Sequence, residues 1–443
     1  MPKTIPTNSK RRRGAKSASS ASTTSAFSVS RPAGLITARE AVRRLGVKPS
    51  TLYAYVSRGL LRSVGVQSSR ERRYYADDVE RLKRLRRNGR RTAVPRGPFD
   101  SLAPMLDSAI CLVDNGRLYY RGIDAAELAD CVTLEETARL LWQTEAAHPF
   151  YPPDASFRLQ ERLKDLAPAL GPTERARTIL VGLATEDVGA LDVSPEAVLR
   201  SGGRLVSAVA SALTGTTIAG MPIHLQLATA WNLDAQGADL IRRCLVLAAD
   251  HELNTSTFVA RCVASTAASP YAAVIAALGA LAGPRHGGQT SHVENLLRDL
   301  INAQDVMGAF TARLQRDGIP GFGGESIPGF GHPLYPGGDV RATNILGTLE
   351  QMKLSRRSSI LLKMGEQIFD RIGRRPNFDF SLATVAVVLD LPRGTGLGLF
   401  LLGRTVGWIA HAIEQYSTQA LIRPRARYVG TLPLPEDADR HRI

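Results

Sequence analysis

The 443-residue sequence lacks the features that mark a membrane or exported protein. Its apolar runs are interrupted by glycine or by a charged residue well before the roughly 20 residues that a membrane-spanning helix needs. The N-terminus is basic, but Ser, Thr and Ala follow where a secretory signal would carry an apolar segment. The sequence therefore predicts no transmembrane helix and no export, and we expect a cytoplasmic protein.

Cysteine is also scarce. The four cysteines are Cys111, Cys131, Cys244 and Cys262. They are scattered, without the CxxC spacing that is typical of zinc sites and redox motifs. They lie in segments that look helical, so we expect four reduced core residues. The spacing predicts neither a disulfide framework nor a metal site.

Acidic residues are scarce in the first part of the chain only. Residues 1–99 hold 24 Lys and Arg against 5 Asp and Glu, whereas residues 100–443 hold 32 against 36. The formal net charge of +15 thus comes from a basic module joined to a mildly acidic body. This asymmetry indicates either a nucleic-acid partner for the module or a solubilising basic tail.

The basic module divides into a tail, a folded part and a linker. Residues 1–31 carry too little apolar surface to fold and are predicted to be a disordered basic tail. Residues 32–89 predict a small winged helix-turn-helix domain. The linker is residues 90–99.

The helix-turn-helix prediction rests on start and stop signals. Thr37 and Glu40 have the spacing of a capping box, and Gly46 would end the first helix. Pro49 would begin a second helix that ends at Arg58. A basic stretch, residues 70–75, and a third helix, residues 77–88, would follow.

This segment resembles the winged helix-turn-helix of MerR-type regulators. The matching residues are Thr37 to Gly46, Thr51-Leu52-Tyr53-Ala54-Tyr55, Arg58-Gly59-Leu60-Leu61 and Arg72-Arg73-Tyr74. The resemblance implies that the second helix enters the major groove of DNA and that the wing touches the backbone. The implied DNA-binding residues are Ser50, Thr51, Tyr53, Tyr55, Arg70, Arg72 and Arg73. The alternative is that the two helix tyrosines are partly core and the arginines merely solvated. No long dimerising helix follows residue 88, so pairing would come from the body.

The body is predicted to be almost entirely α-helical. Two short extended pieces in residues 116–124 precede a helix that Asp124 would cap. From there to about residue 270, apolar residues recur with the helical period or cover the whole helix. No run of alternating strands appears, so we expect an all-α fold around a large core.

Histidines on irregular segments mark a candidate site. His251 begins a helix, and His332 lies on a loop in which 8 Gly and 4 Pro occupy residues 318–338. His286 lies in Gly283-Pro284-Arg285-His286-Gly287-Gly288, ahead of a helix for which Ser291 and Glu294 predict a capping box. A neutral imidazole in such a gap can donate a hydrogen bond to a developing oxyanion. The alternative is a simple helix-helix turn.

Charged residues further along the chain complete the constellation. Arg341 begins one helix and Asp379 precedes another. A single helix face would carry Arg404, Trp408, His411 and Gln415. Arginines clamp carboxylates, neutral histidines polarise carbonyls and a carboxylate can remove a proton from an activated C–H, so the set suits a small dicarboxylate. Two plainer interpretations are that Arg404 pairs with Glu414 in the core and that Asp379 only caps its helix.

From about residue 114 to residue 430 the body resembles citrate synthase. The motifs, in order, are YRGID, DHELNTST, GPRHGG, GFGHPLYPGGDVRA, NFDF, GRTVGWIAHAIEQ and IRPRARYVG. The resemblance implies an all-α homodimer. A large domain, residues 100–286 and 376–443, would carry a small domain, residues 287–375, and closure of the two would form the site.

The resemblance also implies a role for each site residue. Asp379 would remove a proton from the acyl-CoA thioester, His286 would stabilise the enol(ate), and His332 would polarise the ketone of oxaloacetate. The implied carboxylate-binding residues are His251, Arg341, Arg404 and, reaching the neighbouring subunit's site, Arg423. The implied reaction joins acetyl-CoA, oxaloacetate and water into citrate and CoA, with no permanently bound cofactor and no metal.

The sequence departs from the family pattern on the acyl-CoA side. Gln289-Thr290 stand where the family usually has Ala-Asn, and Leu382-Ala383 where it has Ser-Gly. Pro333 and Pro336 stand in place of an Arg and a Lys. Two alternative functions are therefore kept: a DNA-binding regulator with a citrate synthase body as metabolite sensor, and a 2-methylcitrate synthase using propionyl-CoA.

Overall fold

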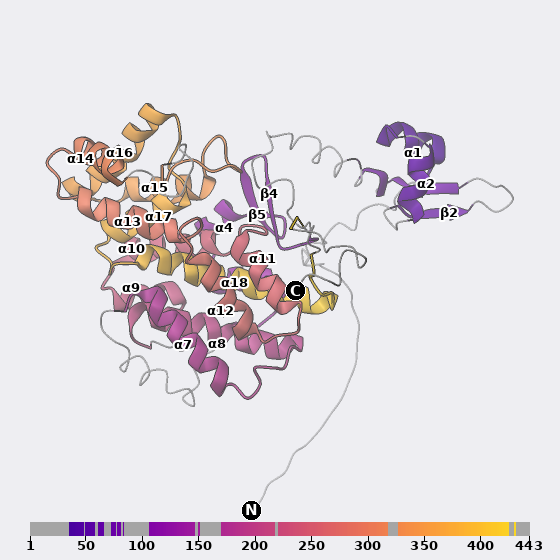
Figure 1. Ribbon diagram of the computed structural model, residues 1–443, viewed down its shortest axis with the longest axis horizontal. Helices are drawn as coiled ribbons and strands as arrows, with labels where there is room; N and C mark the ends of the chain where they lie inside the picture. Colours follow the sequence, from indigo (N-terminus) through magenta and orange to yellow (C-terminus); the bar gives the residue numbers. More distant parts are fainter. Residues whose placement is uncertain are drawn as a thin grey trace, which may run out of the picture. The chain divides into compact units, whose positions relative to one another are not determined.

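The structure is a computed structural model, and it divides into two compact units, Met1–Met105 and Leu106–Ile443 (Figure 1). The residues it describes are 35–47, 49–57, 61–65, 72–76, 78–80, 83, 106–146, 149–150, 170–217, 220–317, 327–424 and 429–430. The predicted tail, the predicted linker and the wing residue Arg70 lie outside these ranges, as does most of the predicted third helix.

The first unit is built from a small sheet and two helices. Strands β1 (Leu35–Thr37), β3 (Arg72–Tyr75) and β2 (Ser63–Gly65) pair antiparallel in the order β1-β3-β2. Helix α1 (Ala38–Leu45) begins at Thr37, whose hydroxyl accepts the Glu40 N–H at 3.2 Å, and ends at Gly46 in the left-handed conformation. Helix α2 (Pro49–Ser57) follows. The first two predicted helices are thus confirmed.

The second unit opens with an antiparallel meander of β4 (Cys111–Asp114), β5 (Arg117–Tyr120) and β6 (Ile123–Asp124). The remaining described elements are the helices α4 (Ala125–Cys131), α5 (Leu134–Trp142), α7 (Pro172–Glu186), α8 (Pro195–Thr214), α9 (Ile223–Ala230), α10 (Ala235–Ala248), α11 (Thr255–Ala264), α12 (Pro270–Leu281), α13 (Gly288–Leu300), α14 (Val306–Asp317), α15 (Val340–Gln351), α16 (Arg356–Ile372), α17 (Phe378–Val388) and α18 (Thr395–Thr418). The predicted helical body and the N-cap at Asp124 are confirmed.

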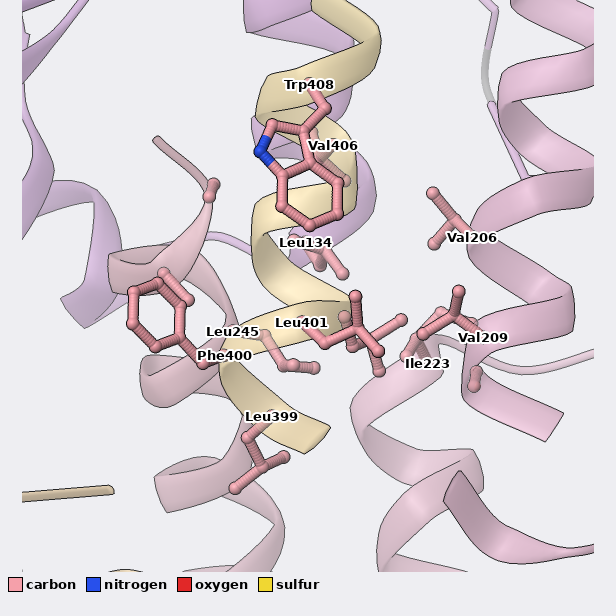
Figure 2. Packing of buried hydrophobic residues seen from close by; sticks show 14 of the residues in the cluster. Leu134, Val206, Val209, Ile223, Leu245, Leu399, Phe400, Leu401, Val406 and Trp408 are labelled. Atoms are coloured by element: carbon pink, nitrogen blue, oxygen red, sulfur yellow. The ribbon is translucent and has the colours of Figure 1, made fainter. Parts of the chain in front are cut away.

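Helix α18 is the central helix of this unit. It packs against α5, α8, α10, α11, α12 and α17. Figure 2 shows its apolar side chains, among them Leu401 and Trp408, surrounded by residues such as Val209 and Ile223 from other helices. The helix is long and apolar enough to cross a membrane, but 94% of its most apolar window is buried inside the protein. Its apolarity is therefore accounted for by the core.

A second hydrophobic cluster gathers around α13, α14, α16 and α17. Helix α17 contributes to both clusters: Phe380 and Ala383 pack in the second, whereas Leu382 and Val385 pack in the main one. The start of α17, which carries Asp379, is therefore held from two sides.

The capping box expected at the start of α13 is wrong. Helix α13 has Gly287 as its N-cap and no side-chain cap, so the capping box at Ser291 does not form. Glu294 is buried instead, where it accepts the N–H groups of Gly394 and Gly396 at 2.9 and 3.0 Å. It thus ties α13 to the start of α18.

The cysteines also differ from expectation. All four are free, but only Cys244 is fully buried. Cys131 is exposed, and Cys111 lies on strand β4 rather than on a helix. Alternation along a short half-buried strand explains the position of Cys111, because its neighbour Leu112 points to solvent.

Candidate active site

A cavity of about 310 Å³ in the second unit brings together residues from widely separated segments. Its lining consists of His251, Asn254, Arg285, His286, Gln289, Ile327, Phe330, Gly331, His332, Pro333, Arg341, Asn377, Phe378, Asp379, Phe400 and Arg404. Six of the seven predicted catalytic and substrate-binding residues are among them. The seventh, Arg423, is exposed on the segment after α18 and does not line the cavity.

A tight turn between α12 and α13 places His286 in the cavity. A Cβ on Gly288 would lie 2.6 Å from the Ala282 carbonyl oxygen, so the turn requires glycine there. The Nε2 atom of His286 is 2.8 Å from the Ser256 hydroxyl, which also receives the Trp408 indole N–H at 3.3 Å. Burial, aided by Arg404, lowers the pKa of His286 to about 4, so the imidazole is neutral at neutral pH.

Two more histidines lie close together. The rings of His251 and His332 are 5.2 Å apart in an edge-to-face arrangement. His251 Nε2 is 2.9 Å from the hydroxyl of the buried Tyr335. Burial and then Arg341 lower the pKa of both, that of His332 to about 4 and that of His251 well below its usual value. Both rings are therefore neutral hydrogen-bonding groups.

The glycine-rich loop that carries His332 is fastened to the start of α17. Gly331, with φ at 75°, donates its N–H to Arg375 O at 2.8 Å and accepts the Asn377 side-chain amide at 3.1 Å. A left-handed conformation of this kind favours glycine. The segment that carries His332 is thereby fixed to the segment that carries Asp379.

Arg341 is a buried and fully compensated cation. Asp339 accepts its Nε and Nη2 at 2.9 and 2.8 Å. The same carboxylate accepts the Phe378 N–H at 3.1 Å, which links α15 to α17. Although burial opposes it, Arg341 lowers the pKa of Asp339. Asp339 and Tyr335 are not among the residues predicted from the sequence, although both lie in the loop motif GFGHPLYPGGDVRA.

Arg404 is different because its charge is not paired. It is fully buried on α18, and only its Nε is bonded, to the Ala248 carbonyl at 2.9 Å. Its Nη1 and Nη2 have no hydrogen-bond partner among the described residues. The suggested pair with Glu414 is wrong, since Glu414 binds Arg261 at 2.8 Å. A buried guanidinium that lines a cavity and has two unsatisfied nitrogens calls for an anionic ligand.

The other residues predicted on the same face of α18, Trp408, His411 and Gln415, contact residues next to the site rather than the cavity itself. His411 lies 3.2 Å from the Asp250 carboxylate, next to His251 in sequence. Gln415 accepts from Arg261 at 2.9 Å, and Trp408 donates to Ser256. These contacts therefore fix the segment before and within α11.

Asp379 lies in the first turn of α17 but does not cap the helix. The N-cap is Asn377, whose side chain accepts the Phe380 N–H at 3.3 Å. Asp379 Oδ1 accepts the Thr290 hydroxyl at 2.5 Å. Burial raises the pKa of Asp379 to about 6, and the Thr290 hydrogen bond opposes the rise. A carboxylate with that pKa is suited to act as a general base near neutral pH.

A second cavity, of about 610 Å³, adjoins the first. The two share residues 330–333 of the glycine-rich loop. Arg374 and Arg375 also line it, and the Arg375 guanidinium lies 4.4 Å from the centre of the Phe369 ring. Cationic groups thus stand at its wall even though Pro333 and Pro336 carry no charge.

The candidate DNA-contact residues are partly exposed. Tyr53 is 57% exposed and Arg72 is exposed, whereas Thr51, Tyr55 and Arg73 are half-buried. Tyr55 packs against the small core, so the core alternative applies to Tyr55 but not to Tyr53. Nothing is described for the Ser50 side chain or for Arg70.

Within the described ranges, no group of three or more His, Cys, Asp or Glu side chains is arranged to hold a metal ion.

Comparison with known proteins gives two family matches. The model described as "Citrate synthase, C-terminal domain" matches residues 101–425, and the model described as "MerR HTH family regulatory protein" matches residues 36–88.

Relatives and solved structures agree with the first match. The chain is 36% identical over 206 residues to 2-methylcitrate synthase 1 of Corynebacterium glutamicum, covering 44% of this chain and 51% of that protein. It is 30% identical over 346 residues to a citrate synthase of Mycolicibacterium smegmatis, covering 72% and 90%. A crystal structure of citrate synthase from Thermotoga maritima superposes with a TM-score of 0.56 at 27% identity, covering 75% of this chain and 95% of that one. The matched region thus spans about half of the first relative and most of the other two.

Proposed function

Because the chain belongs to the citrate synthase family, we propose that it condenses a short-chain acyl-CoA with oxaloacetate. With acetyl-CoA the reaction is acetyl-CoA, oxaloacetate and water giving citrate and free CoA. The observation that carries the proposal is the open guanidinium of Arg404 in a cavity that also holds three histidines of lowered pKa and a carboxylate base.

Oxaloacetate would bind first, through its two carboxylates. Arg404 offers two unpaired nitrogens, and Arg341 and His251 line the same cavity. His332, neutral because burial lowers its pKa to about 4, would donate to the keto oxygen and leave the keto carbon electrophilic. A cationic imidazole is not needed, because a neutral donor already stabilises the developing alkoxide.

The carbon nucleophile would arise by proton transfer to Asp379. The base takes a proton from the carbon next to the thioester carbonyl, and His286 donates a hydrogen bond to the thioester oxygen as the enol(ate) forms. Ser256 acts on the tautomer of His286 because its single hydroxyl proton is shared between two acceptors, Asn254 Oδ1 at 2.9 Å and His286 Nε2 at 2.8 Å. When the hydroxyl donates to Nε2, the ring proton resides on Nδ1 and is available to the substrate. The enol(ate) carbon then attacks the keto carbon, and water cleaves the thioester to release CoA.

The adjoining cavity would hold the rest of the thioester. It shares residues 330–333 with the catalytic cavity, and Arg374 and Arg375 in its lining suit the phosphates of CoA. We further propose the division into a large domain and a small domain, residues 287–375, with the substrate between them. The homodimer, with Arg423 reaching the partner's site, and the cytoplasmic location belong to the same proposal.

The test is release of free CoA thiol by the purified protein with oxaloacetate and either acetyl-CoA or propionyl-CoA. Wild type is expected to release thiol, and Asp379→Asn is expected to lose nearly all of that activity. The ratio of kcat/KM for the two thioesters decides between citrate and 2-methylcitrate formation. Wild-type release no faster than that of Asp379→Asn would refute the enzymatic function and favour a sensor.

A second function, DNA binding by residues 32–89, is favoured by the MerR match and by the exposed Tyr53 and Arg72. Phosphate contacts release counterions, so the affinity of the full chain for duplex DNA should fall steeply as salt rises. Arg72→Ala should reduce the slope of log affinity against log salt concentration by about one, the amount expected for one lost phosphate contact. Affinity that does not depend on salt would exclude phosphate contacts.

A further inference from the structure

The side chain that contacts the proposed base is an unexpected one. Thr290 is fully buried in the first turn of α13, and its hydroxyl lies 2.5 Å from Asp379 Oδ1. The contact joins two helices that pack closely along their length, α13 and α17.

The Thr290 hydroxyl has little freedom to turn elsewhere. Its backbone N–H is bonded to Gly287 O at 2.9 Å, and its methyl group lies 3.1 Å from where a Cβ on Gly396 would stand. One turn later, Glu294 fixes the same helix to the start of α18. A β-branched side chain held at both its backbone and its methyl group presents its hydroxyl in one direction.

The contact also distinguishes the two oxygens of Asp379. Oδ1 accepts the hydroxyl, whereas Oδ2 has no hydrogen bond to any residue that the structure describes. Since Asp379 lines the cavity, Oδ2 is the oxygen left for a substrate proton.

We propose that Thr290 is the positioning residue of the catalytic base: its hydroxyl holds Oδ1 of Asp379 so that the carboxylate is ionised and presents Oδ2 to the acyl-CoA carbon. The role rests on the proposed function. Six other charged or titratable side chains line the same cavity, namely His251, Arg285, His286, His332, Arg341 and Arg404. Asp339, the partner of Arg341, also acts on the carboxylate. Among the groups that act on Asp379, Thr290 is the direct hydrogen-bond donor.

The contact has a physical reason to matter. Burial disfavours the charged form of Asp379, and a hydrogen bond donated to a carboxylate favours it. Arg341 helps, but its charge is already compensated by Asp339. Without the hydroxyl, the base would be protonated over more of the neutral range and free to rotate about χ2.

Three single variants of the full chain test the proposal. Thr290→Val keeps the branched shape and removes the hydroxyl, whereas Thr290→Ser keeps the hydroxyl and removes the methyl group. The matched control is Thr384→Val on α17, because Thr384 is equally buried but donates to the Phe380 carbonyl within its own helix. Circular dichroism and thermal unfolding establish that each variant is folded.

Two readouts are required. Infrared difference spectra over pH follow protonation of Asp379 in the ligand-free protein, with Asp379→Asn identifying its signal. Thiol release gives kcat and KM over the same pH range. Thr290→Val is expected to raise the Asp379 midpoint by about one pH unit and to lower kcat about 10- to 100-fold, with KM for oxaloacetate nearly unchanged. Thr290→Ser should keep the Asp379 midpoint and kcat close to their wild-type values. Thr384→Val should leave the midpoint and kcat unchanged.

A Thr290→Val midpoint equal to that of wild type would overturn the proposal. So would a Thr290→Ser protein that titrates like Thr290→Val, since packing of the methyl group would then be the cause. If wild type releases no thiol, the proposed function fails, while the infrared titration still decides whether Thr290 holds the carboxylate.

Discussion

The same substitution at two buried arginines of one cavity is expected to change the stability of the ligand-free protein in opposite directions. Arg404→Met removes a cation whose Nη1 and Nη2 are unpaired, whereas Arg341→Met removes the partner of the buried Asp339. Methionine has similar length and no polar atom, so packing is largely kept. We therefore expect Arg404→Met to stabilise the ligand-free protein and Arg341→Met to destabilise it.

The magnitudes follow from the contacts. Each of the two unsatisfied nitrogens of Arg404 costs about 1–3 kcal/mol in the wild-type protein. The variant avoids both costs but loses the hydrogen bond from Arg404 to Ala248 O, which offsets one of them. The net gain for Arg404→Met is about 1–3 kcal/mol in the free energy of unfolding. Arg341→Met leaves the Asp339 carboxylate buried without its cation, which costs about 3–5 kcal/mol.

Urea unfolding followed by circular dichroism measures both changes, with and without oxaloacetate. At 1,000 times its dissociation constant the ligand should stabilise wild type by about 4.1 kcal/mol. It should stabilise Arg404→Met hardly at all, so the order of stability reverses when ligand is added. A ligand-free Arg404→Met protein that is less stable than wild type would refute the reasoning, as would equal stabilisation of both by oxaloacetate.

Three further predictions concern the same site. Because Asp379 must be ionised to act and its pKa is raised to about 6, kcat should fall as pH drops through 6, and a flat profile from pH 5 to 8 would contradict this. Ser256→Ala removes the hydroxyl that contacts His286 Nε2 and should lower kcat about 10-fold at unchanged KM for oxaloacetate, measured by thiol release. Gly288→Ala should destabilise the protein by about 1–3 kcal/mol through overpacking against Ala282 O, whereas Gly279→Ala, where no atom lies within 4 Å, should stabilise it by about 0.5–1 kcal/mol. Thermal unfolding compares the two glycine variants.

Much of this architecture was predictable because its signals are local. A cap such as Thr37 or Asp124 acts within one turn of the chain, and the sequence alone shows it. The quoted motifs also identified six residues that line one cavity. The prediction failed at Glu294, where a local pattern suggested a cap but the carboxylate reaches α18, about a hundred residues further along. Contacts of that range leave no mark in residue spacing.

Sequence spacing does not reveal which of the two buried arginines is paired with a carboxylate. Arg341 and Arg404 are the same residue type in two of the quoted motifs, yet a carboxylate compensates Arg341 at two atoms and Arg404 at none. The difference arises because Asp339, two residues before Arg341, turns back at the helix start to pair with it. Asp250, the carboxylate that acts on Arg404, pairs instead with His411.

The charge balance of the cavity bears on how a dicarboxylate is held. Arg341 and Asp339 cancel, the three histidines are neutral at neutral pH, and Arg404 supplies one open positive charge against the Asp379 carboxylate. Two substrate carboxylates would therefore exceed the positive charge available from these residues. Arg285 lines the cavity and adds a further cation from the same chain, whereas Arg423 is exposed and lies outside it. A second anchor on the partner subunit, as proposed for Arg423, would complete the neutralisation.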